Sequence, residues 1–413
     1  MQQTTRDPVR SKLFARRRIL VGTVLTVALA AGFYLPLTLL APIDPVPAQA
    51  LAVAVPTLTP AQISFPLYGA AAVGAIGYDG VLASFGSTEA LPIASITKIV
   101  TALVSLDARP LALGETGPEI ALSEVDAQFY REQVADGGSV VPVVDGATIS
   151  QYAMLQLMLL PSANNYAESM ANWAFGSEEA FLTAARSWLD THGFAATTIT
   201  DPTGILPSNV STATELVELA RLAVENPVIS QIAATPSAEI PGIAIVENTN
   251  SLLGRDGVDG IKTGTLDEAG YCLLFSADYV VGGETVTLIG AALGGPDRPT
   301  LDESISALLA GTVAGFQSVE LVKAGQPVAE YETVWGDDST AVAAESRSIV
   351  AWAGSSIAAL VESEPVLYGE AGQDVGEISF AVGTRIVTVP IELDSKIADP
   401  GPWWRLSNPF ALF

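Results

Sequence analysis

Cysteine and histidine are almost absent from this chain of 413 residues, which contains one of each, Cys272 and His192. A single cysteine excludes a disulfide within the chain and any cysteine-rich metal site. A single histidine excludes a histidine-rich zinc site and argues against a Ser-His-Asp triad. Any acid–base chemistry in this chain must therefore rely mainly on other residue types.

Basic residues are also scarce, since 19 lysines and arginines stand against 45 acidic residues and leave a net charge of −26. This balance argues against a nucleic acid as the partner, because phosphate binding needs clustered basic side chains. Hydrophobic residues make up 49% of the chain and charged residues only 15%, so a large core can be buried. At about 100–200 residues per domain, the length allows two or three domains.

The basic residues gather at the amino terminus, where six of the 19 lie in the first 18 positions. Residues 19–43 carry no charge, and the 23 residues 19–41 exceed the length of about 20 that a membrane-spanning helix needs. Because a basic flank stays in the cytoplasm, we predict a cytoplasmic tail over residues 1–18 and a transmembrane anchor that places the rest outside the cell. A signal peptide cleaved near Ala50, at Ala48-Gln49-Ala50, remains open as the alternative.

The exported part is predicted to contain two domains of different character. Residues 42–60 hold five prolines and are interpreted as a linker. Residues 61–317 form a mixed α/β (α+β) domain, with apolar spacing that predicts helices over 96–105, 148–160, 164–174, 177–190, 212–225 and 300–316. Residues 318–400 form a smaller β-rich domain, with hairpin turns expected at 282–283 in the first domain and 383–384 in the second. The aromatic tail, residues 401–413, is expected to pack on this second domain or to touch a membrane interface.

Three short motifs occur once each: Ser95-Ile96-Thr97-Lys98, Ser162-Ala163-Asn164 and Lys262-Thr263-Gly264. Taken singly they are weak, because an N-cap serine, a turn and an edge strand guarded by lysine produce the same letters. Together, in this order, they are a strong indication of serine-based acyl transfer.

Each motif has a chemical rationale. Ser95 begins a predicted helix, and Lys98 lies one turn later on the same side, where a neutral amine can take the serine proton. Burial and a positive neighbour such as Lys262 would both favour that neutral amine. The loop after Pro161 would present Ser162 to relay a proton and Asn164 to bind a peptide amide. In the predicted strand around Lys262, Gly264 would admit a ligand close to the backbone.

The three motifs, with four longer stretches, resemble the serine D-alanyl-D-alanine carboxypeptidases, which are low-molecular-mass penicillin-binding proteins of peptidase family S11. The resemblance covers about residues 65–316, and its stretches are IASITKIVTAL at 93–103, LQLMLLPSANNYAESMA at 155–171, DPTGILPSNVSTATEL at 201–216 and VDGIKTGTLDEAGYCLLFSA at 258–277.

The resemblance implies a penicillin-binding-protein/β-lactamase-like transpeptidase fold, with an antiparallel sheet flanked by helices and an inserted helical region. It implies removal of the last D-alanine of a peptidoglycan stem peptide, no metal or organic cofactor, and inhibition by β-lactams. The implied nucleophile is Ser95, with Lys98 as its base and Ser162 assisting proton transfer. The implied substrate-binding residues are Asn164, Lys262, Thr263, Gly264, Thr265 and Arg298, and the implied oxyanion hole is formed by the backbone N–H groups of Ser95 and Thr265.

Two departures and two rival functions accompany this resemblance. Ala163 and Asn165 stand where the family often has glycine and aspartate, and the tail lacks the family's amphipathic C-terminal helix, so the N-terminal segment would act as the anchor. A serine β-lactamase is one rival, although its S-D-N motif differs at Ala163. A non-catalytic cell-wall-binding protein is the other.

Overall fold

The computed structural model describes residues 8–144 and 146–413, and it divides into two compact units. The large unit consists of Leu58–Ser318 with Val350–Ser355, and the small unit contains the remaining described residues. The domain boundary that the sequence predicts near residue 317 places residues 350–355 in the second domain. In the structure, this short stretch belongs to the large unit. The first seven residues of the predicted cytoplasmic tail lie outside the described residues.

The large unit is built on a five-stranded antiparallel sheet in the order β10-β11-β12-β2-β3. Its central strands are buried on both faces, which explains their small and apolar residues. The predicted turn at Gly282-Gly283 is confirmed, because both glycines have positive φ and join β11 to β12. The strands are β2 (Ala70–Ala75), β3 (Ala83–Gly86), β10 (Val258–Leu266), β11 (Gly270–Val281) and β12 (Glu284–Gly295).

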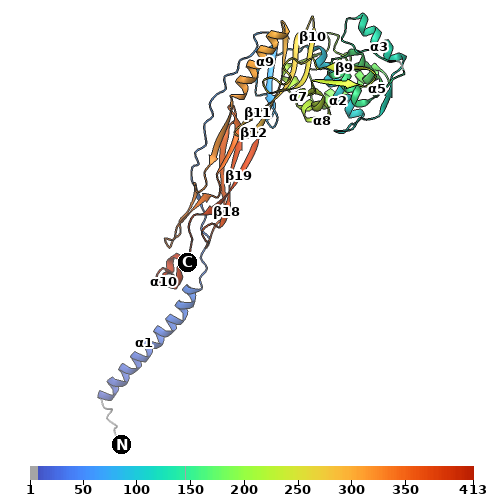
Figure 1. Ribbon diagram of the computed structural model, residues 1–413. Coiled ribbons are helices and arrows are strands. Elements are labelled where there is room, and N and C mark those ends of the chain that lie inside the picture. The colour runs from blue at the N-terminus through green and yellow to red at the C-terminus, as the bar shows by residue number, and fades with distance from the viewer. Residues whose placement is uncertain (1–7, 145) are drawn as a thin grey trace. The chain divides into compact units, whose positions relative to one another are not determined.

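Helices cover both faces of this sheet (Figure 1). Helix α7 (Ala213–Glu225) packs on β2 and β12, and α9 (Arg298–Val313) packs on β11 and β12. The two helices belong to separate hydrophobic clusters, one containing Leu219 and the other containing Leu308. The sheet is therefore the middle layer of a sandwich, with the larger cluster on the α7 side.

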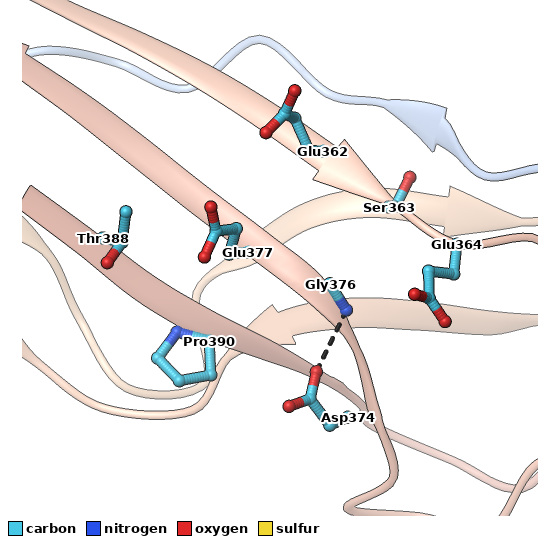
Figure 2. Close-up of a pocket in the computed structure, with 8 residues that line it drawn as sticks. All are labelled: Glu362, Ser363, Glu364, Asp374, Gly376, Glu377, Thr388 and Pro390. Carbon is cyan, nitrogen blue, oxygen red and sulfur yellow. Dashed lines mark hydrogen bonds between the residues drawn. The ribbon is translucent and has the colours of Figure 1, made fainter.

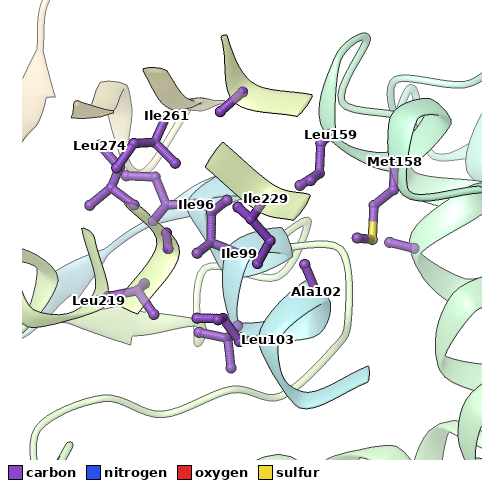
Figure 3. Packing of buried hydrophobic residues seen from close by; sticks show 14 of the residues in the cluster. Ile96, Ile99, Ala102, Leu103, Met158, Leu159, Leu219, Ile229, Ile261 and Leu274 are labelled. Carbon is purple, nitrogen blue, oxygen red and sulfur yellow. The ribbon is translucent and has the colours of Figure 1, made fainter. Parts of the chain in front are cut away.

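The larger cluster continues into a helical region around α2 (Thr97–Ala108), whose first ten residues are all buried. Figure 3 shows Ile96, Ile99 and Leu103 among side chains from other elements of this cluster. The remaining helices of the large unit are α3 (Glu124–Ala135), α4 (Gln151–Leu159), α5 (Asn164–Phe175), α6 (Glu178–Thr191) and α8 (Pro227–Ala233). Short strand pairs complete it: β4 (Leu91–Pro92) with β7 (Val210–Ser211), β5 (Glu119–Ala121) with β6 (Thr148–Ser150), and β8 (Ser237–Ile240) with β9 (Ala244–Glu247).

Local capping sets the helix boundaries. Thr212 caps α7 by accepting a hydrogen bond from the Glu215 N–H at 3.1 Å, as expected from the sequence. The helix predicted over 148–160 starts later, because Thr148–Ser150 is a strand and Ser150 caps α4. The helix predicted from residue 96 is preceded by a single 3-10 turn, η1 (Ala94–Ile96).

The small unit contains a six-stranded antiparallel sheet in the order β1-β14-β15-β19-β18-β17. The predicted hairpin at residues 383–384 is confirmed between β18 (Asp374–Val382) and β19 (Arg385–Leu393). The other strands of this sheet are β1 (Gln49–Ala50), β14 (Pro327–Tyr331), β15 (Ser339–Ala343) and β17 (Ile357–Ser363). Strand β13 (Phe316–Val322) pairs with β16 (Arg347–Trp352), and each of these two strands has residues in both units.

The segment predicted as a linker, residues 42–60, is partly incorporated into this sheet. Strand β1 pairs with β14, and Val46 forms an isolated bridge with Val366. A proline-rich stretch can do this at a sheet edge, where its missing N–H groups are not needed by a further strand.

Helix α1 (Pro8–Leu39) includes a 28-residue stretch, Lys12–Leu39, that is long and apolar enough to cross a membrane, with an 18-residue window of mean hydropathy 2.0 in which no residue is buried. The tail forms α10 (Gly401–Ser407) and the turn η2 (Pro409–Ala411). Helix α10 contacts the C-terminal end of α1, where the Tyr34 hydroxyl donates to the Leu406 carbonyl at 2.6 Å. Part of the tail packs on the small unit, as the sequence suggested, because the centre of the Trp404 ring lies 6.0 Å from that of the Trp335 ring.

Candidate active site

Ser95 lies in the 3-10 turn η1, which contacts the strands β10 and β11. The preceding Ala94 has a φ of +47°, a conformation that non-glycine residues rarely adopt and that is enriched at functional sites. A Cβ on Gly204 would lie 2.0 Å from the Ala94 carbonyl oxygen, and one on Gly264 would lie 2.9 Å from that of Ile93. Gly264 therefore permits the approach of the chain's own Ser95 turn, whereas the sequence suggested the approach of a ligand.

The Lys98 amine is fully buried and makes three hydrogen bonds. Nζ lies 2.9 Å from Ser95 Oγ, 2.7 Å from Asn164 Oδ1 and 2.7 Å from the Thr203 carbonyl oxygen. Burial lowers the pKa of Lys98 to about 7, against the opposing effect of the carboxylates of Asp201 and Glu168. Of the two causes that the sequence suggested, burial accounts for the lowered pKa of Lys98, and the charge of Lys262 does not contribute to it.

These contacts determine where the lone pair of the neutral amine points. A neutral amine has two N–H bonds, and the Thr203 carbonyl can only accept one of them. Asn164 Oδ1 accepts the other, in the amide orientation that its remaining partner requires. The third contact is Ser95, so the lone pair is directed at the serine hydroxyl, as a general base requires.

A loop that the sequence motifs did not single out holds the Thr203 carbonyl in place. The buried Asp201 carboxylate accepts hydrogen bonds from the N–H groups of Thr203, Gly204 and Leu206. It also accepts from the Thr203 hydroxyl at 2.6 Å and from the Asn209 amide. The sequence signal was present in DPTG at 201–204, because an aspartate before such a turn commonly accepts from the following N–H groups.

The second motif spans the junction between α4 and α5. Ser162 is 6% exposed and has a φ of +63°, which again places a strained non-glycine residue in the site. Asn164 is the first residue of α5, and its N–H donates to the Ser139 carbonyl at 2.7 Å. This anchoring brings the Asn164 side chain onto Lys98, although 66 residues separate them.

The third motif lies on β10, where Lys262 is 2% exposed. Burial lowers the pKa of Lys262 well below its ordinary value, and the positive charges of Lys98 and Arg298 lower it further. Its Nζ donates to the Thr263 carbonyl at 3.1 Å, and the Thr263 hydroxyl lies 2.6 Å from that of Thr249. The charged groups of the first and third motifs are therefore close enough to influence one another.

Arg298 lies beside the third motif. Its Nη2 donates to Thr265 Oγ1 at 3.2 Å, and its guanidinium stacks 5.4 Å from the centre of the Tyr271 ring. Its Nη1 is buried and makes no hydrogen bond to any described residue. A buried guanidinium nitrogen without an acceptor suits a carboxylate ligand, which takes two parallel N–H bonds.

A cavity of about 660 Å³ in the small unit was considered as a second candidate site. Figure 2 shows Glu362, Glu364, Asp374 and Glu377 around it, on the strands β17 and β18 and the segments that flank them. Within residues 8–144 and 146–413, no cluster of three or more histidine, cysteine or acidic side chains is arranged to hold a metal ion. The lining of this cavity includes no lysine, arginine or histidine that could bind an anionic substrate, so the Ser95 site is the stronger candidate.

The known proteins that this chain resembles are D-alanyl-D-alanine carboxypeptidases and endopeptidases. The family model described as D-alanyl-D-alanine carboxypeptidase matches residues 76–293. The D-alanyl-D-alanine endopeptidase of Pseudomonas aeruginosa is 32% identical over 243 residues, which are 54% of this chain and 73% of that protein. The D-alanyl-D-alanine carboxypeptidase DacC of Escherichia coli is 29% identical over 345 residues, which cover 79% of this chain and 83% of the relative.

Solved structures show the same fold. PBP3 of Streptococcus pneumoniae, described as a peptidoglycan synthesis regulatory factor, matches 81% of this chain and all of that chain with a TM-score of 0.59 and 22% identity. Penicillin-binding protein 5 of Haemophilus influenzae matches 83% of this chain and all of that chain with a TM-score of 0.57 and 19% identity. The expected penicillin-binding-protein fold, with an antiparallel sheet, flanking helices and a C-terminal β domain, is thereby confirmed.

Proposed function

This chain belongs to the D-alanyl-D-alanine carboxypeptidase family, peptidase family S11, and we propose that it removes the terminal D-alanine of peptidoglycan stem peptides through an acyl-enzyme on Ser95. The observation that carries the proposal is the 2.9 Å contact between Ser95 Oγ and a buried Lys98 whose pKa is about 7. A lysine with that pKa is a competent general base near neutral pH.

The acylation step uses the three motifs together. Lys98 takes the Ser95 proton as Oγ attacks the carbonyl carbon between the two D-alanines, and the tetrahedral oxygen is stabilised by the backbone N–H groups of Ser95 and Thr265. The proton then passes through Ser162 to the amine of the leaving D-alanine. Asn164 binds the substrate backbone, and the terminal carboxylate is bound by Lys262, Thr263, Thr265 and Arg298.

Deacylation follows the same path in reverse. Water attacks the ester carbonyl and gives its proton to Lys98. Lys98 then passes that proton to Ser95 Oγ as the ester C–O bond breaks and the shortened peptide leaves. A β-lactam resembles the substrate at the scissile amide but leaves no departing amine, so it would remain bound to Ser95 as a stable ester.

The first experiment is to record the intact mass of residues 61–413 over time with benzylpenicillin, with Ser95→Ala as the control. We expect one lasting penicillin adduct on the wild type and none on the control. Rapid turnover of penicillin without an adduct would favour a serine β-lactamase. Unmodified protein with unchanged penicillin would instead favour a non-catalytic cell-wall-binding protein.

The relatives include both carboxypeptidases and endopeptidases, so the substrate must be tested separately. The wild type and Ser95→Ala should be incubated with a pentapeptide ending in D-Ala-D-Ala and, in parallel, with a purified cross-linked peptide dimer. We expect free D-alanine from the first substrate and slower or no cleavage of the second. Preferential cleavage of the dimer would overturn the carboxypeptidase assignment in favour of an endopeptidase.

We also propose that the chain stays anchored in the cell membrane by α1, with the residues that follow this helix outside the cell. Cleavage after Ala50 would remove β1 from the sheet of the small unit and break the contacts of α10 with Tyr34 and Ala41. Next to these contacts, Trp403, Phe410 and Phe413 are exposed, as suits a membrane interface. Mass determination of the N-terminus from membranes washed with carbonate should give the uncleaved chain; a soluble chain starting at Leu51 would refute the anchor.

A further inference from the structure

A chain of hydrogen bonds leads away from the base Lys98 to a carboxylate outside the three motifs. Asn164 Nδ2 donates to Gln133 Oε1 at 2.7 Å, and Gln133 Nε2 donates to Glu168 Oε1 at 2.8 Å. Glu168 lies on α5 one helical turn after Asn164, and Gln133 lies on α3 and is 4% exposed. The second carboxylate oxygen, Oε2, is buried without a hydrogen-bond partner among the described residues.

The Glu168 carboxylate determines which group donates and which accepts in each of these hydrogen bonds. An ionised carboxylate accepts hydrogen bonds but cannot donate them, so Gln133 must turn its NH₂ group toward Glu168. Gln133 then presents its oxygen to Asn164, and Asn164 must turn its own NH₂ group toward Gln133. The Asn164 oxygen is thereby left facing Lys98, where it accepts an N–H of the amine at 2.7 Å.

The reverse arrangement would inhibit the reaction. If position 168 could donate, both amides could flip, and Asn164 would direct an N–H at Lys98. The lone pair of a neutral Lys98 would then accept that N–H and would no longer be free for the Ser95 hydroxyl. The orientation of the Asn164 and Gln133 amides therefore decides whether Lys98 can act as a base.

We propose that Glu168 is a positioning residue for acylation: acting through Gln133 and Asn164, it fixes the amide orientation that leaves the Lys98 lone pair free for Ser95. This inference rests on the proposed function of Ser95 and Lys98. It assigns a role to a residue that lies outside the three motifs, and the role requires the ionised form of the carboxylate.

The charges around Glu168 bear on its ionisation. Burial raises the pKa of Glu168 to about 7; the hydrogen bond from Gln133 opposes this, and the neighbouring acids Glu178, Glu132 and Asp201 add to it. Glu168 in turn raises the pKa of Lys98. Removal of the charge at position 168 should thus lower the pKa of Lys98. It should also allow the Gln133 and Asn164 amides to adopt the reverse orientation.

The test compares the pH dependence of Ser95 acylation by a fluorescent penicillin in four proteins. In Glu168→Gln, the maximal acylation rate should fall by about tenfold, as expected for the loss of one charge-assisted constraint on a general base. The acid limb of its pH profile should move to lower pH, because Lys98 loses a neighbouring negative charge. Glu132→Gln is the control, since it removes an exposed neighbouring charge but no group of the hydrogen bonds that link Glu168 to Lys98. Its maximal acylation rate should stay unchanged.

The fourth protein is the double variant Gln133→Glu with Glu168→Gln, which exchanges the two groups. The carboxylate at position 133 would accept directly from Asn164 Nδ2 and from the amide at position 168, so the Asn164 orientation is restored. We expect its maximal rate to return to within about threefold of the wild type. Rescue of this kind is not expected if Glu168 merely supports the packing of α5 against α3.

The outcomes separate the two proposals. A wild type that is not acylated at Ser95 would refute the proposed function itself. A normal wild type with an unchanged Glu168→Gln profile would refute the role of Glu168 alone. A slow Glu168→Gln whose acid limb does not move and whose rate the double variant fails to restore would also overturn it, with circular dichroism and thermal unfolding confirming that each variant is folded.

Discussion

In the proposed function, the protonation state of Lys98 controls the reactivity of Ser95. The amine lies at the meeting point of three segments, in contact with Ser95, Asn164 and Thr203. Two of these contacts accept its N–H bonds, so only the neutral amine can direct a lone pair at the hydroxyl. Burial makes that neutral form available near physiological pH.

The rate of Ser95 acylation should therefore rise with pH and reach half of its maximum near pH 7, as Lys98 loses its proton. Lys98→Met keeps a long apolar side chain but removes the base, and its acylation rate should fall by about 10²–10⁴-fold. Stopped-flow measurement with a fluorescent penicillin between pH 5.5 and 9 checks both statements. A wild-type rate that is flat across this range would contradict the assignment of Lys98 as the base.

Strand β10 and the turn η1 form the site by close backbone approach. Gly264 faces the Ile93 carbonyl, the Ala94 side chain and Cys272, so the strand can lie directly against the Ser95 turn. The same strand carries Lys262 and Thr265, and Thr265 meets Arg298 from the start of α9. The relative placement of these two elements therefore sets the distance between Ser95 and the residues proposed to bind the substrate carboxylate.

Gly264→Ala should reduce acylation more than it reduces stability, because the added methyl would lie 2.9 Å from the Ile93 carbonyl oxygen and push β10 away from η1. Gly260→Ala on the same strand is the matched control, since its nearest contact is the Ser276 hydroxyl, the end of a side chain, and not a backbone atom. Penicillin acylation and the thermal unfolding midpoint should be measured for both. Equal loss of activity in the two variants would contradict this account of Gly264.

The two units of the molecule do not follow the order of the chain. Val350–Ser355 returns to the large unit after about thirty residues of the small unit, and within the large unit the Trp352 ring packs 5.0 Å from that of Phe316. Trp352 is 7% exposed and shares a hydrophobic cluster with Leu308 of α9. A piece ending near residue 317 would therefore lack part of the core of the large unit.

Trp352→Ala should destabilise the large unit by about 3–5 kcal/mol, the usual result of emptying a buried aromatic site. Trp403→Ala is the control, because that side chain is 82% exposed and should affect stability little. The readout is thermal unfolding followed by penicillin binding, which reports on the large unit alone. Similar midpoints for the two variants would show that residue 352 does not belong to the core.

Much of this protein follows from local sequence. The order of the three motifs identified the family, Gly282-Gly283 and Gly383-Thr384 predicted the two hairpins, and Thr212 predicted the start of α7. The uncharged stretch 19–41 predicted the apolar helix α1. These features were readable because turns, caps and hydrophobic runs depend on residues only a few positions apart.

What local spacing could not supply was the set of long-range contacts. The Thr203 carbonyl and the Gln133 amide reach the active site from segments 105 and 31 residues away from their partners, and neither belongs to a motif. Likewise, residues 42–60 contribute the edge strand β1. Trp352 belongs to the same hydrophobic cluster as Ala71, which lies some 280 residues earlier in the chain. The sequence by itself determined the candidate nucleophile, the candidate base and the main elements, because these are set by neighbouring residues. Only the tertiary structure decided the direction of the lone pair and the pKa of Lys98, because burial and hydrogen-bond partners arise when distant segments pack together.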